Sequence, residues 1–102
     1  MTRRLLSPEE IADRLQMVPE WRVENGRLVR DYTFAAYNQG VRFAVTVAGI
    51  AEELDHHPDI LLSWRRVSVS VFTHSAGGLT GWDFALAEAV DLRGVLPEGA
   101  AG

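Results

Sequence analysis

The 102-residue chain contains no cysteine. Disulfide bonds, thiolate nucleophiles and cysteine-ligated metals are therefore excluded, and the composition fits a reducing, cytoplasmic location. A long apolar run is also lacking. The richest stretch, residues 41–51, is interrupted by Arg42 and falls well short of the roughly 20 residues that cross a bilayer. We therefore expect no membrane partner.

An excess of positive charge is missing as well. The chain carries 10 Lys and Arg against 14 Asp and Glu, whereas nucleic-acid-binding domains are usually basic. The doublets Arg3-Arg4 and Arg65-Arg66 are each too short for a phosphate-binding patch, so we expect no direct binding of nucleic acid. The hydrophobic content of 47% is typical of one compact domain, which we expect to span residues 1–102.

Local signals predict the first helix and a hairpin. Ser7, Pro8 and Glu10 form a capping box with proline at the first helical position, and the helix should end near Pro19. Asn25-Gly26 predicts a tight turn, because both residues tolerate positive φ. Pairing across this turn would place five side chains on one buried face: Trp21, Val23, Leu28, Tyr32 and Phe34.

Apolar residues at three- and four-residue steps predict a long helix from Tyr37 to Asp55. Its apolar surface is wide enough to contact both a sheet and a second subunit. Strands at 60–64 and 67–73 follow, then a helix from Thr80 to Arg93 and a tail, 95–102, that we expect to be frayed. The order predicts an α+β fold: a four-stranded antiparallel sheet with three helices packed on one face.

All three histidines of the chain lie close together in the second half. His56 and His57 precede Pro58, which should end the long helix at or just before them. His74 stands at the end of a predicted strand, and Asp83 lies in the first turn of the last helix. Histidine exchanges protons near neutral pH, so ends of elements that converge here indicate a proton-transfer site. Glu52, four residues before His56, would share its helical face if the helix persists that far.

The same residues are also compatible with a structural role and with a metal site. Asp83 lies three residues after Thr80 and would complete a second capping box, which is a purely structural role. Three histidines and an aspartate are also plausible zinc or iron ligands. Adjacent residues such as His56 and His57 usually diverge, however, and no His-Glu-x-x-His motif is present, so a metal site is disfavoured.

Taken together, these residues resemble a known family. Residues 51–59, Ala-Glu-Glu-Leu-Asp-His-His-Pro-Asp, are similar to the signature of the pterin-4a-carbinolamine dehydratases. The similarity covers nearly the whole chain except the tail, and it continues through Trp64, 67–71, Thr73-His74, 78–80 and Asp83. It implies a lyase without metal or cofactor in pterin recycling. Its substrate would be 4a-hydroxytetrahydrobiopterin, which loses water to give quinonoid dihydrobiopterin.

The resemblance also implies roles for single residues. His56 and His74 would form the acid/base pair, and His57 would mainly hold the substrate. Asp83 and Glu52 would orient the imidazoles, and Glu52 and Trp21 are expected to contact the substrate. Relatives form dimers and tetramers, so self-association is expected. An aromatic amino acid hydroxylase, which generates the carbinolamine, is a candidate partner.

Three positions depart from the family pattern. Trp82 stands where some relatives carry a basic residue, Ile60 where an aromatic residue is frequent, and Ser68 where a polar residue or histidine is common. A different class of function is a non-catalytic binding module, because some family members act as dimerisation cofactors of a transcription factor and others resemble assembly chaperones. Retention of the three histidines and Asp83 favours catalysis, because a pure scaffold has no physical need for them.

Overall fold

The computed structural model describes residues 3–102, so the first two residues of the predicted domain lie outside the described residues. The predicted order of helices and strands is confirmed. The elements are α1 (Pro8–Leu15), β1 (Arg22–Glu24), β2 (Arg27–Thr33), α2 (Tyr37–Leu54), β3 (Asp59–Ser63), β4 (Arg66–Val71), the short 3-10 helix η1 (His74–Ala76) and α3 (Gly81–Arg93). Within this range, no helix is long and apolar enough to cross a membrane.

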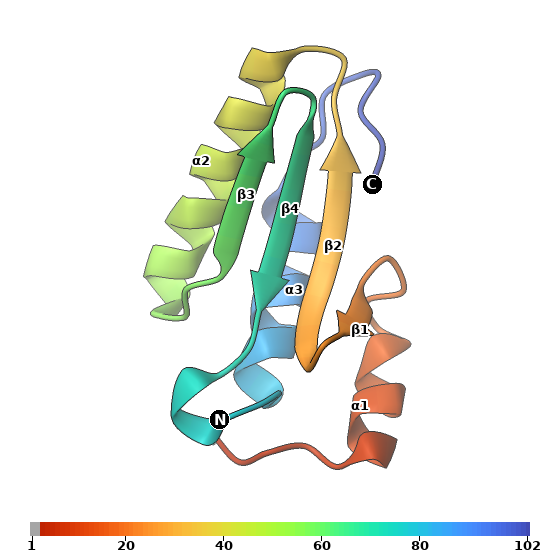
Figure 1. Cartoon of the computed structure of the whole chain (residues 1–102), viewed down its shortest axis with the longest axis vertical. Coiled ribbons are helices and arrows are strands. Elements are labelled where there is room, and N and C mark those ends of the chain that lie inside the picture. The colour runs from red at the N-terminus through yellow and green to blue at the C-terminus, as the bar shows by residue number, and fades with distance from the viewer. Residues whose placement is uncertain (1–2) are drawn as a thin grey trace.

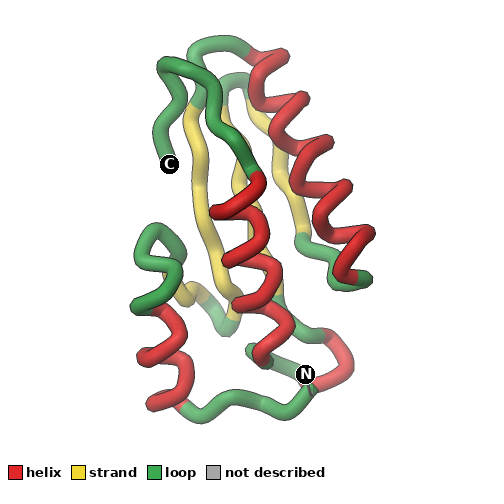
Figure 2. Tube along the Cα trace, turned by 180° about the vertical axis from the view of Figure 1, so that it is seen from behind, coloured by secondary structure: helices red, strands yellow, loops and turns green. Residues whose placement is uncertain are grey.

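The four strands form one antiparallel sheet in the order β1-β2-β4-β3. Helices α2 and α3 run along one face of this sheet, while α1 lies at its lower end beside β1 (Figures 1 and 2). The opposite face carries no helix (Figure 1). The core lies between the sheet and the two long helices, and its fully buried members include Leu28, Tyr32, Val67, Val69, Val71, Val47, Phe84, Leu86 and Val90.

The predicted hairpin turn is confirmed, but one of its buried side chains is not. Asn25 and Gly26 have φ angles of 51° and 74°, and Val23 pairs with Leu28 as expected. Val23 is nevertheless 40% exposed. Its strand β1 has three residues and lies at one edge of the sheet. Helix α2 contacts β3 and β4, the two strands nearest the opposite edge. The alternation of apolar residues along the strands therefore predicted a wider buried face of the sheet than the structure has.

Hydrogen bonds attach the C-terminal segment, expected to be frayed, to β2. The backbone N–H of Ala101 donates to the carbonyl oxygen of Thr33 at 2.9 Å, and the N–H of Thr33 donates back at 2.6 Å. The Arg30 side chain donates to the carbonyl oxygen of Gly102 at 3.1 Å. The segment thus extends the pairing of β2 beyond the end of the short strand β1, where backbone groups would otherwise lack partners.

Tyr32 is a titratable residue buried within the hydrophobic core. Its side chain is 1% exposed, its ring centroid lies 4.4 Å from that of Phe43, and its hydroxyl has no hydrogen-bond partner among residues 3–102. Burial raises the pKa of the Tyr32 phenol above its ordinary value, because the phenolate would lose its hydration. Stability from this group is therefore complete below about pH 10 and is lost as the pH rises further.

We expect Tyr32→Phe to weaken this alkaline loss of stability. At pH 7 the free energy of unfolding should change by less than about 1 kcal/mol, because the hydroxyl makes no hydrogen bond. Urea unfolding at several pH values measures the free energy of unfolding, and tyrosinate absorbance follows the ionisation of the phenol. The chain has no lysine or cysteine, whose side chains would titrate in the same pH range. Tyr37→Phe, which changes a 52% exposed phenol, is the control. An alkaline decline in Tyr32→Phe equal to that of the wild type contradicts this account.

Candidate functional site

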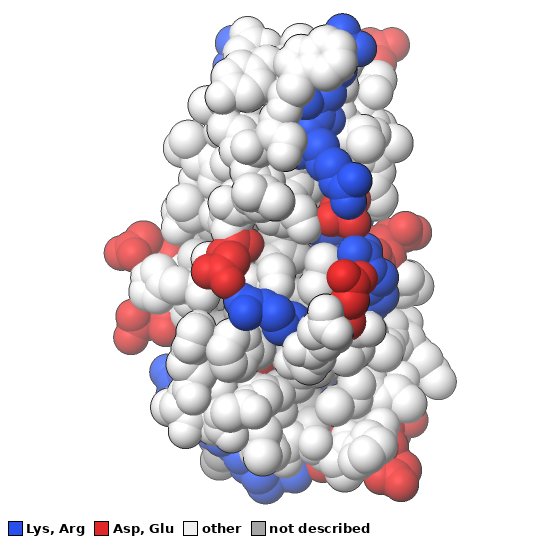
Figure 3. Space-filling view, in the orientation of Figure 1, with Lys and Arg blue, Asp and Glu red and all other residues white. Residues whose placement is uncertain are grey.

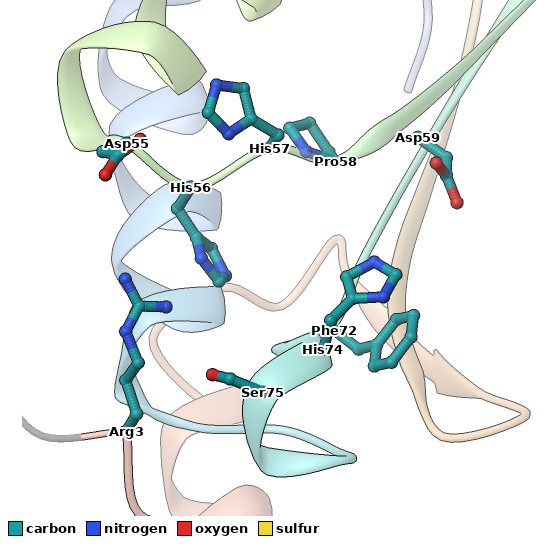
Figure 4. A pocket seen from close by; sticks show the side chains of 9 residues that line it. All are labelled: Arg3, Asp55, His56, His57, Pro58, Asp59, Phe72, His74 and Ser75. Carbon is teal, nitrogen blue, oxygen red and sulfur yellow. The ribbon is translucent and has the colours of Figure 1, made fainter.

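A hollow of about 640 Å³ brings the three predicted histidines together. Three segments form it: the loop between α2 and β3, the end of β4 with η1, and the N-terminal segment before α1 (Figure 4). The lining residues are Arg3, Asp55, His56, His57, Pro58, Asp59, Phe72, His74 and Ser75. The convergence of element ends expected from the sequence is therefore present.

The end of α2 determines where His56 points. Asp55 adopts the left-handed conformation, with φ 50° and ψ 43°, which aspartate tolerates better than most residues. Its N–H donates to the carbonyl oxygen of Glu52 at 3.2 Å, and the N–H of His56 donates to that of Ala51 at 3.1 Å. These two bonds are those of a Schellman motif, which ends the helix before the histidines as predicted.

His56 is bonded to the carboxylate of Asp83 in a buried pair. Its Nε2 lies 2.6 Å from Asp83 Oδ1, and the residues are 5% and 0% exposed. The other oxygen, Oδ2, accepts from Thr73 Oγ1 at 2.9 Å and from the backbone N–H of Thr80 at 2.8 Å. A buried carboxylate is costly unless it is bonded, and both oxygens of Asp83 have partners.

The hydroxyl groups around Asp83 have a defined direction. Thr73 gives its only hydroxyl hydrogen to Asp83, so Thr80, whose oxygen lies 2.7 Å away, must donate to Thr73. Thr80 in turn accepts from the N–H of Trp82 at 3.2 Å. With Asp83 as an acceptor-only carboxylate, His56 Nε2 must be the donor in their bond. Nδ1 is then the ring nitrogen of His56 that no described side chain bonds.

The two interpretations of Asp83 coincide in the structure. Thr80 and Asp83 form the capping box of α3, as the sequence pattern predicts. The same carboxylate bonds His56, which lies 27 residues earlier in the chain. One residue thus starts a helix and holds an imidazole at the wall of the hollow.

Glu52 pairs with His57, and not with His56 as its spacing suggested. Its Oε1 lies 2.7 Å from His57 Nε2, and the two side chains are 78% and 55% exposed. A helical face shared with His56 required α2 to persist to that residue, and α2 ends at Leu54. Figure 4 shows the rings of His56 and His57 pointing in different directions from the loop. Within residues 3–102, no group of three or more candidate ligands is placed to hold a metal ion.

His74 differs from the other two histidines in its surroundings. It starts the turn η1 after β4, is exposed, and makes no side-chain hydrogen bond to a described residue. Its nearest aromatic neighbour is Phe72, whose ring centroid is 4.1 Å away, and both side chains line the hollow (Figure 4). Both nitrogens of His74 are therefore open to a ligand.

Trp82 lies near both His56 and the positively charged side chain of Arg3. It stands at the position where some relatives carry a basic residue. The guanidinium of Arg3 lies 5.5 Å from the centre of the Trp82 ring, and Trp82 packs beside His56 at a centroid distance of 6.4 Å. Arg3 itself lines the hollow, so the N-terminal segment places a positive charge at the wall of the hollow.

Trp21, expected to contact the substrate, lies elsewhere. It is 4% exposed, belongs to the core, and donates its Nε1–H to Asp91 of α3 at 2.8 Å; it does not line the hollow. Sequence reasoning in turn gave no role to Thr73, Phe72 or Arg3. Thr73 carried a usable signal, because it continues the buried alternation of Val67, Val69 and Val71 as a polar residue. Phe72 and Arg3 carried none.

Comparisons with known proteins agree with this geometry. A family model described as pterin 4 alpha carbinolamine dehydratase matches residues 4–92. Relatives from Chloroflexus aurantiacus and Metallosphaera sedula, both named provisionally as pterin-4-alpha-carbinolamine dehydratases, are 45% and 42% identical. Each matches 84% of this chain, and the match covers 92% and 90% of their own lengths.

Solved structures show the same fold. A transcriptional coactivator/pterin dehydratase from Brucella melitensis has a TM-score of 0.81 and 27% identity, covering 88% of this chain and 98% of its own. A pterin dehydratase-like protein identified as a RuBisCO assembly factor, with a TM-score of 0.58 and 22% identity, shares the fold alone. The chain belongs to the pterin 4 alpha carbinolamine dehydratase family, as its His-His-Pro segment indicated.

Proposed function

We propose that this chain eliminates water from 4a-hydroxytetrahydrobiopterin to give quinonoid dihydrobiopterin. One observation carries the proposal: His56, bonded to the buried carboxylate of Asp83, and His74, whose imidazole bonds no described side chain, line the same hollow. Family membership supports the class of reaction. An aromatic amino acid hydroxylase, which generates the carbinolamine, is the proposed source of the substrate, and the proposed place of action is the cytoplasm.

The chemistry needs two proton transfers and nothing else. The bond from C4a to the hydroxyl oxygen breaks as one group delivers a proton to the departing oxygen, which leaves as water. A second group removes the proton from N5, and the C4a=N5 double bond forms. No oxidation state changes, so no redox cofactor is required. The enzyme donates one proton to the substrate and accepts one from it, so the number of protons bound to the enzyme is the same before and after the reaction.

The surroundings of the histidines support a division of this work. His56 and His74 are the proposed acid/base pair, because Nδ1 of His56 and both nitrogens of His74 can reach a ligand. Asp83 holds His56 in one tautomer and orientation. His57, with one nitrogen bonded to Glu52, is the proposed substrate holder at the rim. Positioned acid–base catalysis of this kind contributes roughly 10²–10⁴-fold.

Self-association is the second part of the proposal. Tyr37 and Val45 on α2 and Leu61 on β3 are 52%, 67% and 66% exposed, and exposed apolar surface of this kind is a candidate contact for another protein. β3 is also an edge strand, with backbone groups free to pair. Figure 3 shows an uncharged surface over the upper part of the side where β3 and α2 lie, above two acidic clusters, and this upper surface suits a second copy of this chain.

We expect the purified protein to accelerate loss of the carbinolamine, followed by its ultraviolet absorbance. His74→Ala should lower kcat by roughly 10²–10⁴-fold, because it removes one of the two proton-transferring groups. Thermal unfolding should be nearly unchanged, because His74 is exposed. Treatment with EDTA should leave the wild-type rate unaltered. A wild-type rate equal to the uncatalysed rate would refute the proposed activity, and loss of activity in EDTA would favour a metal.

Asp83→Asn and Glu52→Gln form a matched pair of carboxylate changes. In Asp83→Asn the new NH₂ group must face a donor, either His56 Nε2–H or the Thr73 and Thr80 donors. We expect a lower kcat and a loss of about 1–3 kcal/mol in the free energy of unfolding. Glu52→Gln changes an exposed pair, so stability should fall by less than about 1 kcal/mol and KM should change more than kcat. If the two substitutions lower the free energy of unfolding equally, the assignment of Asp83 as the buried, structurally essential carboxylate is contradicted.

Val45→Glu should disrupt self-association, because it places a charge on the exposed apolar face of α2. Light scattering on a size-exclusion column gives the mass of each species. Leu92→Glu, at an 84% exposed apolar position of α3, is the matched control and should keep the wild-type mass. A monomeric wild type, or a Val45→Glu protein with the wild-type mass, counts against this surface.

A further inference from the structure

Three side chains, from the start of β2, the residue after β4 and the start of η1, form a stack beside the hollow. The guanidinium carbon of Arg27 lies 4.6 Å from the centre of the Phe72 ring. The Phe72 ring centroid lies 4.1 Å from that of His74, at an interplanar angle of 39°. Phe72 directly follows β4 and His74 begins η1 two residues later, and both side chains line the hollow. The order is cation, aromatic ring, imidazole.

The strand pairing holds Arg27 in this place. The register that pairs Leu28 with Val71 brings Arg27 opposite Phe72 on the neighbouring strand. The Arg27 Nε–H donates to Ser70 Oγ at 2.6 Å, and its Nη2 forms an ion pair with Asp59. The guanidinium is thus attached to β4 and β3 at the same time, with 30% of its side chain exposed.

Without this stack, little would fix the imidazole of His74. Its turn is exposed, and its ring nitrogens bond no described side chain. Phe72 is only half-buried, and a small pocket of about 170 Å³, bordered by Asn25, Gly26, Arg27 and Gly77, lies on another side of its ring. Core packing therefore does not hold Phe72 on all sides. The cation on its face supplies the contact that the core does not.

We propose that Phe72, held by Arg27, is the positioning residue that fixes the imidazole of His74 at the wall of the hollow. His56 gets its orientation from a buried carboxylate, whereas His74 gets its orientation from an aromatic face. The catalytic consequence rests on the proposed function: a His74 ring that turns freely spends less time aligned with the substrate, and misplacement of a reacting group lowers the rate of the chemical step.

Proton NMR of the three imidazoles tests the stack without any substrate. Single variants of His56, His57 and His74 assign the signals. In the wild type, the His74 ring protons should be shifted upfield by the Phe72 ring current. Phe72→Leu should abolish this shift, Phe72→Tyr should keep it, and Arg27→Gln should reduce it. Arg65→Gln removes a guanidinium 4.3 Å from the Trp64 ring, away from the hollow, and should leave the shift intact. An unshifted His74 in the wild type, or one unaffected by Phe72→Leu, overturns the proposal.

Kinetics then test the catalytic consequence. Phe72→Leu should lower kcat about 10-fold with KM nearly unchanged, and Phe72→Tyr should restore most of the loss. A merely structural role would instead lower the thermal stability of Phe72→Leu and leave the kcat of its folded fraction intact, which contradicts positioning. If the wild type shows no dehydration at all, the proposed function fails, while the imidazole spectra still decide whether the stack exists.

Discussion

The rest of the site depends on one buried carboxylate. Asp83 is fully buried, and its two oxygens accept from His56, Thr73 and the backbone of Thr80. These partners come from the loop after α2, the end of β4 and the start of α3. A buried charge that loses a partner is strongly destabilising, so these three segments cannot separate without a large cost in free energy. The hollow keeps its shape because its walls share this acceptor.

The two proposed proton carriers differ in stiffness for a physical reason. His56 lies inside the network, where its tautomer follows from the direction of the surrounding hydrogen bonds. His74 lies outside it, on an exposed turn, with an aromatic ring as its neighbour. A bonded imidazole keeps one orientation but has only one free nitrogen. An exposed imidazole keeps both nitrogens available but needs another contact to stay in place. The hollow combines one group of each kind.

Features set by neighbouring residues could be predicted from the sequence, and features set by distant contacts could not. The capping boxes, the Asn25-Gly26 turn and the end of α2 before Pro58 are local, and the structure has them. The spacing alone could not show that Glu52 bonds His57, because the left-handed Asp55 redirects the chain after α2, and aspartate only sometimes adopts that conformation. Trp21 bonds Asp91, 70 residues away, and the 101–102 segment bonds β2. No local pattern encodes such pairs.

The buried pair also bears on the choice between an enzyme and a scaffold. Replacing a buried polar pair by well-packed apolar residues is often neutral or stabilising, so folding alone gives little reason to keep His56 opposite Asp83. A capping box does not require it either, since the bonds between Thr80 and Asp83 are complete without His56. What the pair adds is an imidazole of fixed tautomer that lines the hollow and whose second nitrogen bonds no described side chain. That property is what the proposed acid–base step requires, and the binding of another protein does not require it.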